Sequence, residues 1–65
     1  MTIPVKRNEE YVVDIINIGA KGDGIAQVDE FIVFVPNGKL EKRYNVIITK
    51  VTESFAFARI LKEVV

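Results

Sequence analysis

The sequence contains neither cysteine nor histidine. Without cysteine, neither a disulfide framework nor a thiolate metal site can stabilise the fold. Without histidine, the chain lacks the usual general base near neutral pH and the commonest metal ligand, which excludes catalytic triads and the common zinc sites. An enzyme would have to rely on carboxylates, and the spacing of Asp14, Asp23 and Asp29 places no pair in a defined cleft. We therefore expect a protein without catalytic residues, metal or cofactor.

The chain also has no net charge. Nine basic and nine acidic residues give a net charge of zero, which argues against a general polyanion binder. The charges are unevenly distributed along the chain. Residues 1–14 contain two basic and three acidic residues, a balance of −1, whereas residues 39–50 contain four basic residues and one acidic residue, a balance of +3. The sequence therefore predicts that one end of the molecule is basic.

Long apolar segments are absent as well. No stretch approaches the roughly 18 to 20 apolar residues of a membrane span, and the N-terminal "MTIPVKRNEE" becomes charged where the apolar core of a signal peptide would begin. We expect a cytoplasmic protein with no membrane segment. The 65 residues suffice for one small domain. We expect residues 1–7 to form a flexible N-terminal arm and residues 8–65 to form the domain.

The residues that are present favour strands. Hydrophobic residues make up 49% of the chain, and the abundant valine and isoleucine suit β-structure. Alternation and turn signals predict five strands, at about residues 10–19, 24–28, 31–35, 44–51 and 54–65. A helix over residues 53–64 is the alternative, but the phenylalanines and alanines there alternate with period two. Five short strands predict an all-β fold, a small closed or nearly closed barrel.

Turn residues mark the strand ends. In the first strand the alternation fails at residues 16–18, where a bulge would return Ile18 to the core. Asp29–Glu30 is the expected two-residue hairpin loop. Pro36 ends the third strand because it cannot donate a backbone hydrogen bond, and Asn37–Gly38 is a strong turn pair.

Three of the four glycines lie within six residues, at Gly19, Gly22 and Gly24. Their spacing resembles GxxGxG, but a dinucleotide-binding fingerprint needs a helix directly after the glycines, and here a strand is expected. The GK[ST] motif of a P-loop is also missing. We therefore predict a sharp turn that uses positive φ angles, with a phosphate-binding loop as the alternative. Lys21 lies at the tip of this turn, where it could contact a ligand.

Several of these features together resemble a known family. The elements that carry the resemblance are Gly19, Gly22, Gly24, Ile25, Ala26, Phe34-Val35-Pro36, Ala56 and Ala58, in this order. Over about residues 8–65 they resemble the TRAM domain, an OB-like β-barrel attached to tRNA-modifying methyltransferases and methylthiotransferases and also found as lone archaeal proteins. The resemblance implies a five-stranded OB-like barrel that binds RNA, with tRNA or another structured RNA as the partner and without the catalytic domain that such modules serve.

The sequence departs from the family pattern in two loops. The family often has a glycine in the hairpin where this chain has Glu30, and a glycine-acidic turn where this chain has Glu41-Lys42. These differences affect the expected shape of the loops rather than the expected barrel.

Aromatic side chains are candidates for stacking on nucleic-acid bases, as in other OB-like barrels. In "FAFAR", Phe55, Phe57 and Arg59 share one face of the predicted strand, while Ala56 and Ala58 share the other. Two arrangements remain open. Either the phenylalanines are buried, or the alanines fill the interior of a narrow barrel and the phenylalanines face solvent.

Phe34 is expected outside the barrel if its neighbours Val33 and Val35 fill the core. The other aromatic candidates are Phe31, Tyr11 and Tyr44. Both tyrosines suit the core at strand starts, with their hydroxyls reaching water.

Basic side chains are candidates for phosphate contacts. Lys39, Lys42, Arg43 and Lys50 belong either to an ordinary solvated surface or to a phosphate-binding site, and the family resemblance favours the second. The predicted RNA-binding residues are Lys21, Phe34, Lys39, Lys42, Arg43, Lys50, Phe55, Phe57 and Arg59.

The sequence therefore predicts a free-standing, non-catalytic module that stacks unpaired RNA bases on exposed rings and holds phosphates with lysine and arginine. Weak, sequence-tolerant contacts of this kind would favour single strands over misfolded structures, which suggests an RNA chaperone. The alternative is a protein-interaction module that uses an exposed aromatic patch, which zero net charge favours. We expect a monomer.

Overall fold

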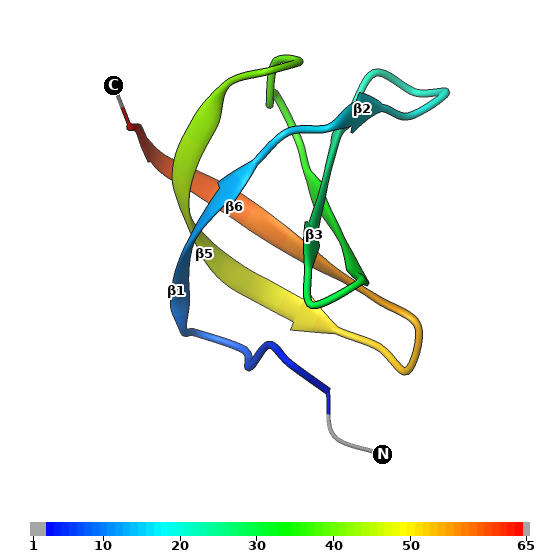
Figure 1. Ribbon diagram of the computed structural model, residues 1–65. Helices are drawn as coiled ribbons and strands as arrows, with labels where there is room; N and C mark the ends of the chain where they lie inside the picture. Colours follow the sequence, from blue (N-terminus) through cyan, green and yellow to red (C-terminus); the bar gives the residue numbers. More distant parts are fainter. Residues whose placement is uncertain (1–2, 65) are drawn as a thin grey trace.

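The structure, a computed structural model, describes residues 3–64, which form one curled β-sheet (Figure 1). The strands are β1 (Glu10–Asp14), β2 (Asn17–Ile18), β3 (Gly24–Val28), β4 (Phe31–Val35), β5 (Arg43–Val51) and β6 (Phe55–Glu63). Their order in the sheet is β1-β5-β6-β4-β3-β2, and β4 pairs with β6 in parallel while the other described pairs are antiparallel. The described residues contain no helix that could cross a membrane. The predicted all-β fold is confirmed.

The sheet curls because its two outermost strands are consecutive in the chain. β1 pairs with β5, and β2 pairs with β3 at the other end of the sheet. Between them, the Ile16 amide donates a hydrogen bond of 2.8 Å to the Ile25 carbonyl oxygen. The result is the predicted OB-like barrel, with six strands rather than five, because the expected first strand divides into two strands that pair with different partners.

This division falls where the alternation of the first strand fails. Ile15 is buried, with 1% of its surface exposed, whereas Ile16 and Ile18 are 54% and 39% exposed. The prediction that a bulge returns Ile18 to the core is therefore wrong. At this point the chain leaves β5 and joins β3, so no single alternating face continues through the change of partner.

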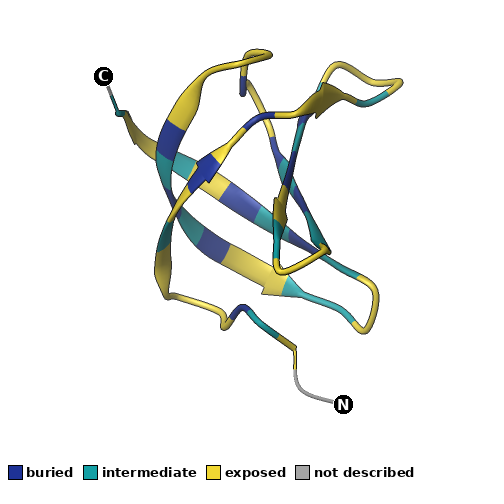
Figure 2. Ribbon diagram, in the orientation of Figure 1, coloured by how far each residue is buried: buried dark blue, intermediate teal, exposed yellow. Residues whose placement is uncertain are grey.

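The core consists mostly of small and branched aliphatic residues, and Figure 2 shows where the buried residues lie along the strands. The buried residues are Val5, Val13, Ile15, Ala26, Val33, Val35, Tyr44, Val46, Ile48, Ala56 and Ala58. No charged side chain is buried within residues 3–64. Period-two alternation explains this selection, since every second residue of β4 and of the first half of β6 points inward.

The segment before β1 contacts the barrel. Val5 is 3% exposed and belongs to the core. The Lys6 amide donates to the Tyr11 hydroxyl over 3.1 Å, and the Asn8 amide donates to the Ile48 carbonyl oxygen over 2.7 Å. The flexibility of residues 1–7 and a domain boundary at residue 8 stay predictions, and residues 1, 2 and 65 lie outside the described part of the chain.

The glycine cluster forms the turn between β2 and β3. The Gly19 amide donates to the Asp23 carbonyl oxygen over 2.8 Å, and Gly22 has a φ of 90°. Gly24, in contrast, does not have a positive φ, so that part of the expectation is wrong. A Cβ atom at Gly24 would lie 3.1 Å from the Gly38 Cα atom, so the glycine permits a close approach of two backbone segments.

Two loops use glutamate at positive φ, where glycine is favoured. Asp29 and Glu30 have φ angles of 50° and 70° and form the predicted two-residue loop between β3 and β4, as a type I′ turn requires. Glu41 has a φ of 67°. Both glutamates lie at the departures from the family pattern, so the loops keep a glycine-like backbone with a residue that is strained there.

Candidate nucleic-acid interface

Three phenylalanines form a cluster on the outer surface of the barrel. Phe34 on β4 and Phe55 and Phe57 on β6 are half-buried, and none belongs to the core. Their ring centroids are 5.5 to 5.6 Å apart in all three pairs. We call these three residues the aromatic cluster. The structure thus brings together predicted site residues from two strands that are far apart in the sequence.

The cluster arises from the pairing of β4 with β6. Val33 lies opposite Ala56, and Phe34 lies opposite Phe57. Ala56 and Ala58 are 0% and 3% exposed, so the small side chains face the interior. The alternation of the strand then turns the phenylalanines outward. Of the two arrangements that the sequence left open, the structure has the one with the alanines inside.

The rings hold one another in place. The Phe34 and Phe57 rings are tilted by 30° to each other, whereas the Phe55 ring stands at 81° and 88° to them, which is the favoured edge-to-face geometry. A base between two rings would need about 3.5 Å on each side. The observed ring spacing leaves no room for it, so a base can stack only on the solvent side of the cluster.

Two exposed cations border the cluster. Lys50 on β5 is the register partner of Phe57, and Arg59 follows Phe57 by two residues on the same strand. Within residues 3–64, neither cation forms an ion pair. Rings with adjacent cations can hold the base and the phosphate of a single-stranded nucleic acid at the same time.

Three further predicted cations lie between β4 and β5 and at the start of β5. We call residues 39–43 the basic segment; Lys39, Lys42 and Arg43 in it are all exposed. Arg43 Nε donates to Asp14 Oδ1 over 2.7 Å, and Lys42 Nζ lies 3.7 Å from Glu63 Oε2. Two of the three cations are therefore engaged with carboxylates.

The contact between Arg43 and Asp14 shifts the pKa of both groups. The hydrogen bond from Arg43, assisted by its positive charge, holds the pKa of the Asp14 carboxyl below its ordinary value of 3.8. The same contact raises the pKa of Arg43. Because the two opposite charges lie side by side, each reduces the electrostatic attraction of the other for a third ion.

The aromatic cluster and the basic segment lie at opposite ends of β6. Phe55 begins the strand, and Glu63, the partner of Lys42, ends it. Glu63 follows Phe57 by six positions, which corresponds to roughly 20 Å at about 3.3 Å per residue. One short ligand cannot contact both groups, whereas a strand of several nucleotides can.

Lys21 is exposed at the tip of the turn between β2 and β3. Figure 1 shows this turn and the segment between β4 and β5 at the same end of the barrel. The nine predicted site residues therefore form two groups. Phe34, Lys50, Phe55, Phe57 and Arg59 lie together, and Lys21, Lys39, Lys42 and Arg43 lie at the other end.

The remaining aromatic candidates lie in the core or against it. Tyr44 is 5% exposed, and Phe31 and Tyr11 pack against the core. The tyrosine hydroxyls accept hydrogen bonds of 3.1 Å from backbone amides, Tyr11 from Lys6 and Tyr44 from Lys39. These hydroxyls hold the neighbouring segments at Lys6 and Lys39, and the expectation that they also reach water stays a prediction.

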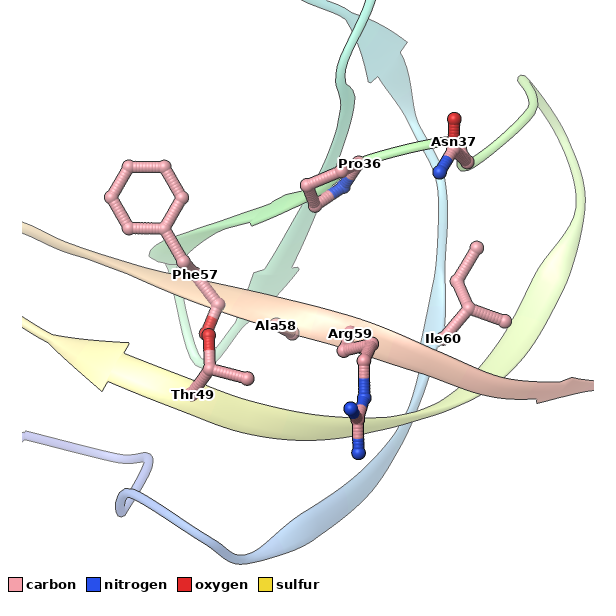
Figure 3. Close-up of a pocket in the computed structure, with 7 residues that line it drawn as sticks. All are labelled: Pro36, Asn37, Thr49, Phe57, Ala58, Arg59 and Ile60. Atoms are coloured by element: carbon pink, nitrogen blue, oxygen red, sulfur yellow. The ribbon is translucent and has the colours of Figure 1, made fainter.

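A hollow of about 300 Å³ lies beside the aromatic cluster (Figure 3). It is lined by Pro36, Asn37, Thr49, Phe57, Ala58, Arg59 and Ile60. Sequence reasoning selected two of these residues, Phe57 and Arg59, and treated Asn37 only as part of a turn. The signal in the sequence that could have indicated the hollow was Pro36. A strand that ends at proline leaves its neighbour in the sheet without a partner beyond that point.

Comparisons with known proteins show the family and the fold. Residues 4–61 match the TRAM domain family. An uncharacterized protein of Methanocaldococcus jannaschii is 50% identical over 56 residues, which cover 86% of this chain and 73% of that protein. The solution structure of a conserved protein of Methanococcus maripaludis superposes with a TM-score of 0.88 at 47% identity and covers 92% of this chain and 86% of that chain.

A larger protein contains a similar segment. The ribosomal RNA large subunit methyltransferase E of Methanosarcina barkeri is 36% identical to this chain over 58 residues. The matched region is 89% of this chain but 22% of the methyltransferase. The similarity therefore concerns one module of that enzyme.

Proposed function

Because the chain belongs to the TRAM domain family, whose members are nucleic-acid-binding modules that also occur in RNA methyltransferases, we propose that it binds RNA through the aromatic cluster and the cations beside it. The proposed partner is tRNA or another structured or single-stranded RNA. The rings stack on unpaired bases, and Lys50 and Arg59 bind the adjacent phosphates.

The position of the aromatic cluster is the observation that supports this proposal most directly. Three large rings lie outside a barrel whose interior holds two alanines of the same strand, Ala56 and Ala58. Apolar side chains gathered at one place on a surface are typical of a binding site. Stacking is worth about 1 to 3 kcal/mol per base and tolerates any base. The rings can therefore supply affinity that a chain of zero net charge does not obtain from phosphates alone.

The second group of cations extends the proposed site. Lys21 and Lys39 would contact RNA that continues past the aromatic cluster toward the other end of the barrel. Lys42 and Arg43 would exchange their carboxylate partners for phosphates, since exposed ion pairs are weak. A separation of roughly 20 Å is compatible with the site sizes of OB folds, about 4 to 16 nucleotides.

Three further expectations from the sequence are part of this proposal: an RNA chaperone activity, a cytoplasmic location and a monomeric state. Stacking favours unpaired over paired strands, so the protein would act as an RNA chaperone. It would do so as a cytoplasmic monomer, without a reaction or cofactor of its own.

The proposal is tested by fluorescence anisotropy with a labelled, unstructured RNA of about twelve nucleotides, within the OB-fold range. The wild type should bind it, and Phe55→Ala should weaken binding by about fivefold or more, because at least about 1 kcal/mol of stacking is lost. Val12→Ala is the matched control, since Val12 is 60% exposed on β1 and lies outside the cluster. Absence of binding by the wild type, or equal losses in both variants, would overturn the proposal.

A protein-interaction module is the second candidate, and the ion pairs of Lys42 and Arg43 favour it because they lower the free positive charge. The aromatic cluster would then contact apolar side chains of a partner. Crosslinking in cells, followed by sequencing of attached RNA and by pull-down before and after nuclease treatment, separates the two. Partners retained after nuclease, with no RNA above background, would favour the protein partner.

A further inference from the structure

We propose that the hollow beside Phe57 is a subsite for one nucleotide and that it favours adenine, an inference that rests on the proposed RNA binding. The hollow lies between the segment at Pro36 and Asn37 and the outer side of β6 (Figure 3). Its volume of about 300 Å³ is at the lower end of the range of small-molecule sites, about 300 to 1,000 Å³. It can therefore hold one small ligand rather than an extended chain.

The hollow exists for two structural reasons. The Ala58 side chain is turned into the core, so only backbone lies between Phe57 and Arg59 on the outer side of β6. In addition, β4 pairs with β6 only as far as Phe57, because the chain turns away at Pro36, while β6 continues to Glu63. Beyond Phe57, this edge of β6 therefore faces no neighbouring strand in the described part of the chain.

Three kinds of chemical group surround this space. Phe57 supplies an aromatic wall, and Arg59 supplies a cation without an ion-pair partner in residues 3–64. Asn37 supplies a side-chain amide, for which the described residues offer no hydrogen-bond partner. A ring, an amide and a cation match the base, the base edge and the phosphate of one nucleotide. Thr49 contributes little polarity, because its hydroxyl donates to the Phe57 carbonyl oxygen over 3.2 Å.

The position of Asn37 is set by a tight turn. The Gly38 amide donates to the Val35 carbonyl oxygen over 3.0 Å, and Asn37 has a φ of 68°. With Pro36 before it, this is the geometry of a type II turn. Gly38 in turn packs against Gly24, where no Cβ atom fits without a shift. The amide is thus attached to a backbone that is held from two sides, which is required for a selective hydrogen bond.

The amide of asparagine favours adenine for a chemical reason. It has one acceptor and one donor side by side, which complement N6 and N7 of adenine in a bidentate pair. An aspartate at the same position would have acceptors only and would favour the N4 amino group of cytosine. Stacking on Phe57 alone cannot reverse the preference between adenine and cytosine, since every base has a ring face.

The test measures the affinities of labelled oligoadenylate and oligocytidylate, each about eight nucleotides long, within the OB-fold range. The wild type should prefer oligoadenylate. Asn37→Gly keeps the backbone conformation and should reduce the affinity ratio of the two RNAs by about fivefold or more, the lower limit expected for one bidentate pair. Asn37→Asp should shift the ratio further, toward oligocytidylate. Asn8→Gly is the matched control, because Asn8 has a φ of 69° and does not line the hollow; its ratio should equal that of the wild type.

A second measurement locates the base. On titration with adenosine monophosphate, the NMR signals of the Asn37 side-chain amide and of Arg59 Nε–H should shift more than those of the Asn8 amide. Equal ratios in wild type, Asn37→Gly and Asn37→Asp, with both RNAs still bound, would overturn the adenine subsite and leave the proposed function intact. Failure of the wild type to bind either RNA would overturn both.

Discussion

The two ends of β6 differ in how their functional side chains are held. At its start, Phe55 and Phe57 contact Phe34, and the three rings fix one another. At its end, Lys42 reaches Glu63, and nearby Arg43 reaches Asp14 in an exposed ion pair. Exposed ion pairs typically contribute about 0 to 1 kcal/mol. The rings are therefore preorganised for a ligand, whereas the cations can change partners at low cost.

This difference shows why charge counted along a sequence is a poor guide to a binding surface. Residues 39–50 have a balance of +3, but Glu63 and Asp14 are brought beside two of those cations by the fold. The aromatic cluster was less obvious in the sequence and is the better-defined feature of the structure. At the start of β6, RNA affinity should come from stacking on the aromatic cluster. At its end, RNA affinity should come from the charge of the basic segment.

The largest effect is expected when the close contact between Gly24 and Gly38 is disturbed. This contact supports the end of the barrel that carries the basic segment. In Gly24→Ala, the new Cβ atom would lie 3.1 Å from the Gly38 Cα atom and from the Val35 carbonyl oxygen. Because backbone atoms cannot move aside easily, the free energy of unfolding should fall by about 1 to 3 kcal/mol. Thermal unfolding followed by circular dichroism measures the change.

Gly19→Ala is the matched control for this variant. A Cβ atom at Gly19 would make only ordinary contacts, 3.6 Å from the Asp23 carbonyl oxygen, and Gly19 does not have a positive φ. It should unfold at the wild-type temperature or slightly above. If both variants unfold alike, the close approach at Gly24 is not what the fold requires.

The next effect separates stacking from charge. Phe57→Ala should lower RNA affinity about tenfold, by the same factor at low and high salt, because salt barely screens stacking. Lys42→Ala should matter mainly at low salt and should reduce the slope of log affinity against log salt by about 0.7, the value for one phosphate contact on a single strand. Anisotropy titrations at several salt concentrations measure both quantities.

The wild-type slope should itself be shallow and correspond to about two to four phosphate contacts. A steep slope together with no effect of Phe57→Ala would identify a purely electrostatic binder and remove the aromatic half of the proposal. If Phe57→Ala unfolds the protein, Phe34→Ala on β4 provides the same comparison from the other strand.

A smaller effect is expected at Glu41, inside the basic segment. Its φ of 67° is strained for glutamate, by about 1 to 2 kcal/mol. Glu41→Gly removes this strain but adds freedom to the unfolded chain, worth about 0.5 to 1 kcal/mol. The net result should be a stabilisation of about 0.5 kcal/mol in denaturant unfolding. Glu53→Gly is the control, because Glu53 is exposed and does not have a positive φ, and it should not stabilise the protein.

The smallest effect concerns the ion pair between Asp14 and Arg43. Since folding lowers the pKa of Asp14, the pair stabilises the folded state above the ordinary aspartate pKa, and this contribution is lost as the pH falls through the lowered value. Asp14→Asn should therefore unfold slightly more easily than the wild type at pH 7, and the difference should vanish in acid. The same variant should bind RNA more tightly at low salt, because it releases Arg43. Unchanged affinity would place Arg43 outside the RNA site.

Much of the secondary structure could be predicted because its signals are local. The predicted strands at residues 24–28 and 31–35 coincide with β3 and β4, and Asp29–Glu30 forms the loop between them. Alternation and turn chemistry act over a few neighbouring residues. The first strand was predicted less well, because its division into β1 and β2 depends on which distant strands lie beside it.

The prediction of the site from the sequence was limited in the same way. Sequence alone placed Phe55 and Phe57 on one face of a strand and Ala56 and Ala58 on the other, since side chains alternate with period two. That alternation is symmetric and does not say which face is inside. The curled sheet decided it, because it buries Ala56 and Ala58 together with branched core residues such as Val33, the register partner of Ala56.

The amino-acid sequence by itself therefore determined the strands from residue 24 onward, the turn between β3 and β4, the opposite faces of β6 and the family. Only the tertiary structure decided which of those faces meets solvent, which carboxylates approach Lys42 and Arg43, and where the hollow at Asn37 lies. The physical reason is distance along the chain. Asp14 and Arg43 are 29 residues apart, and contacts of that separation exist only when the sheet has curled and brought its strands together.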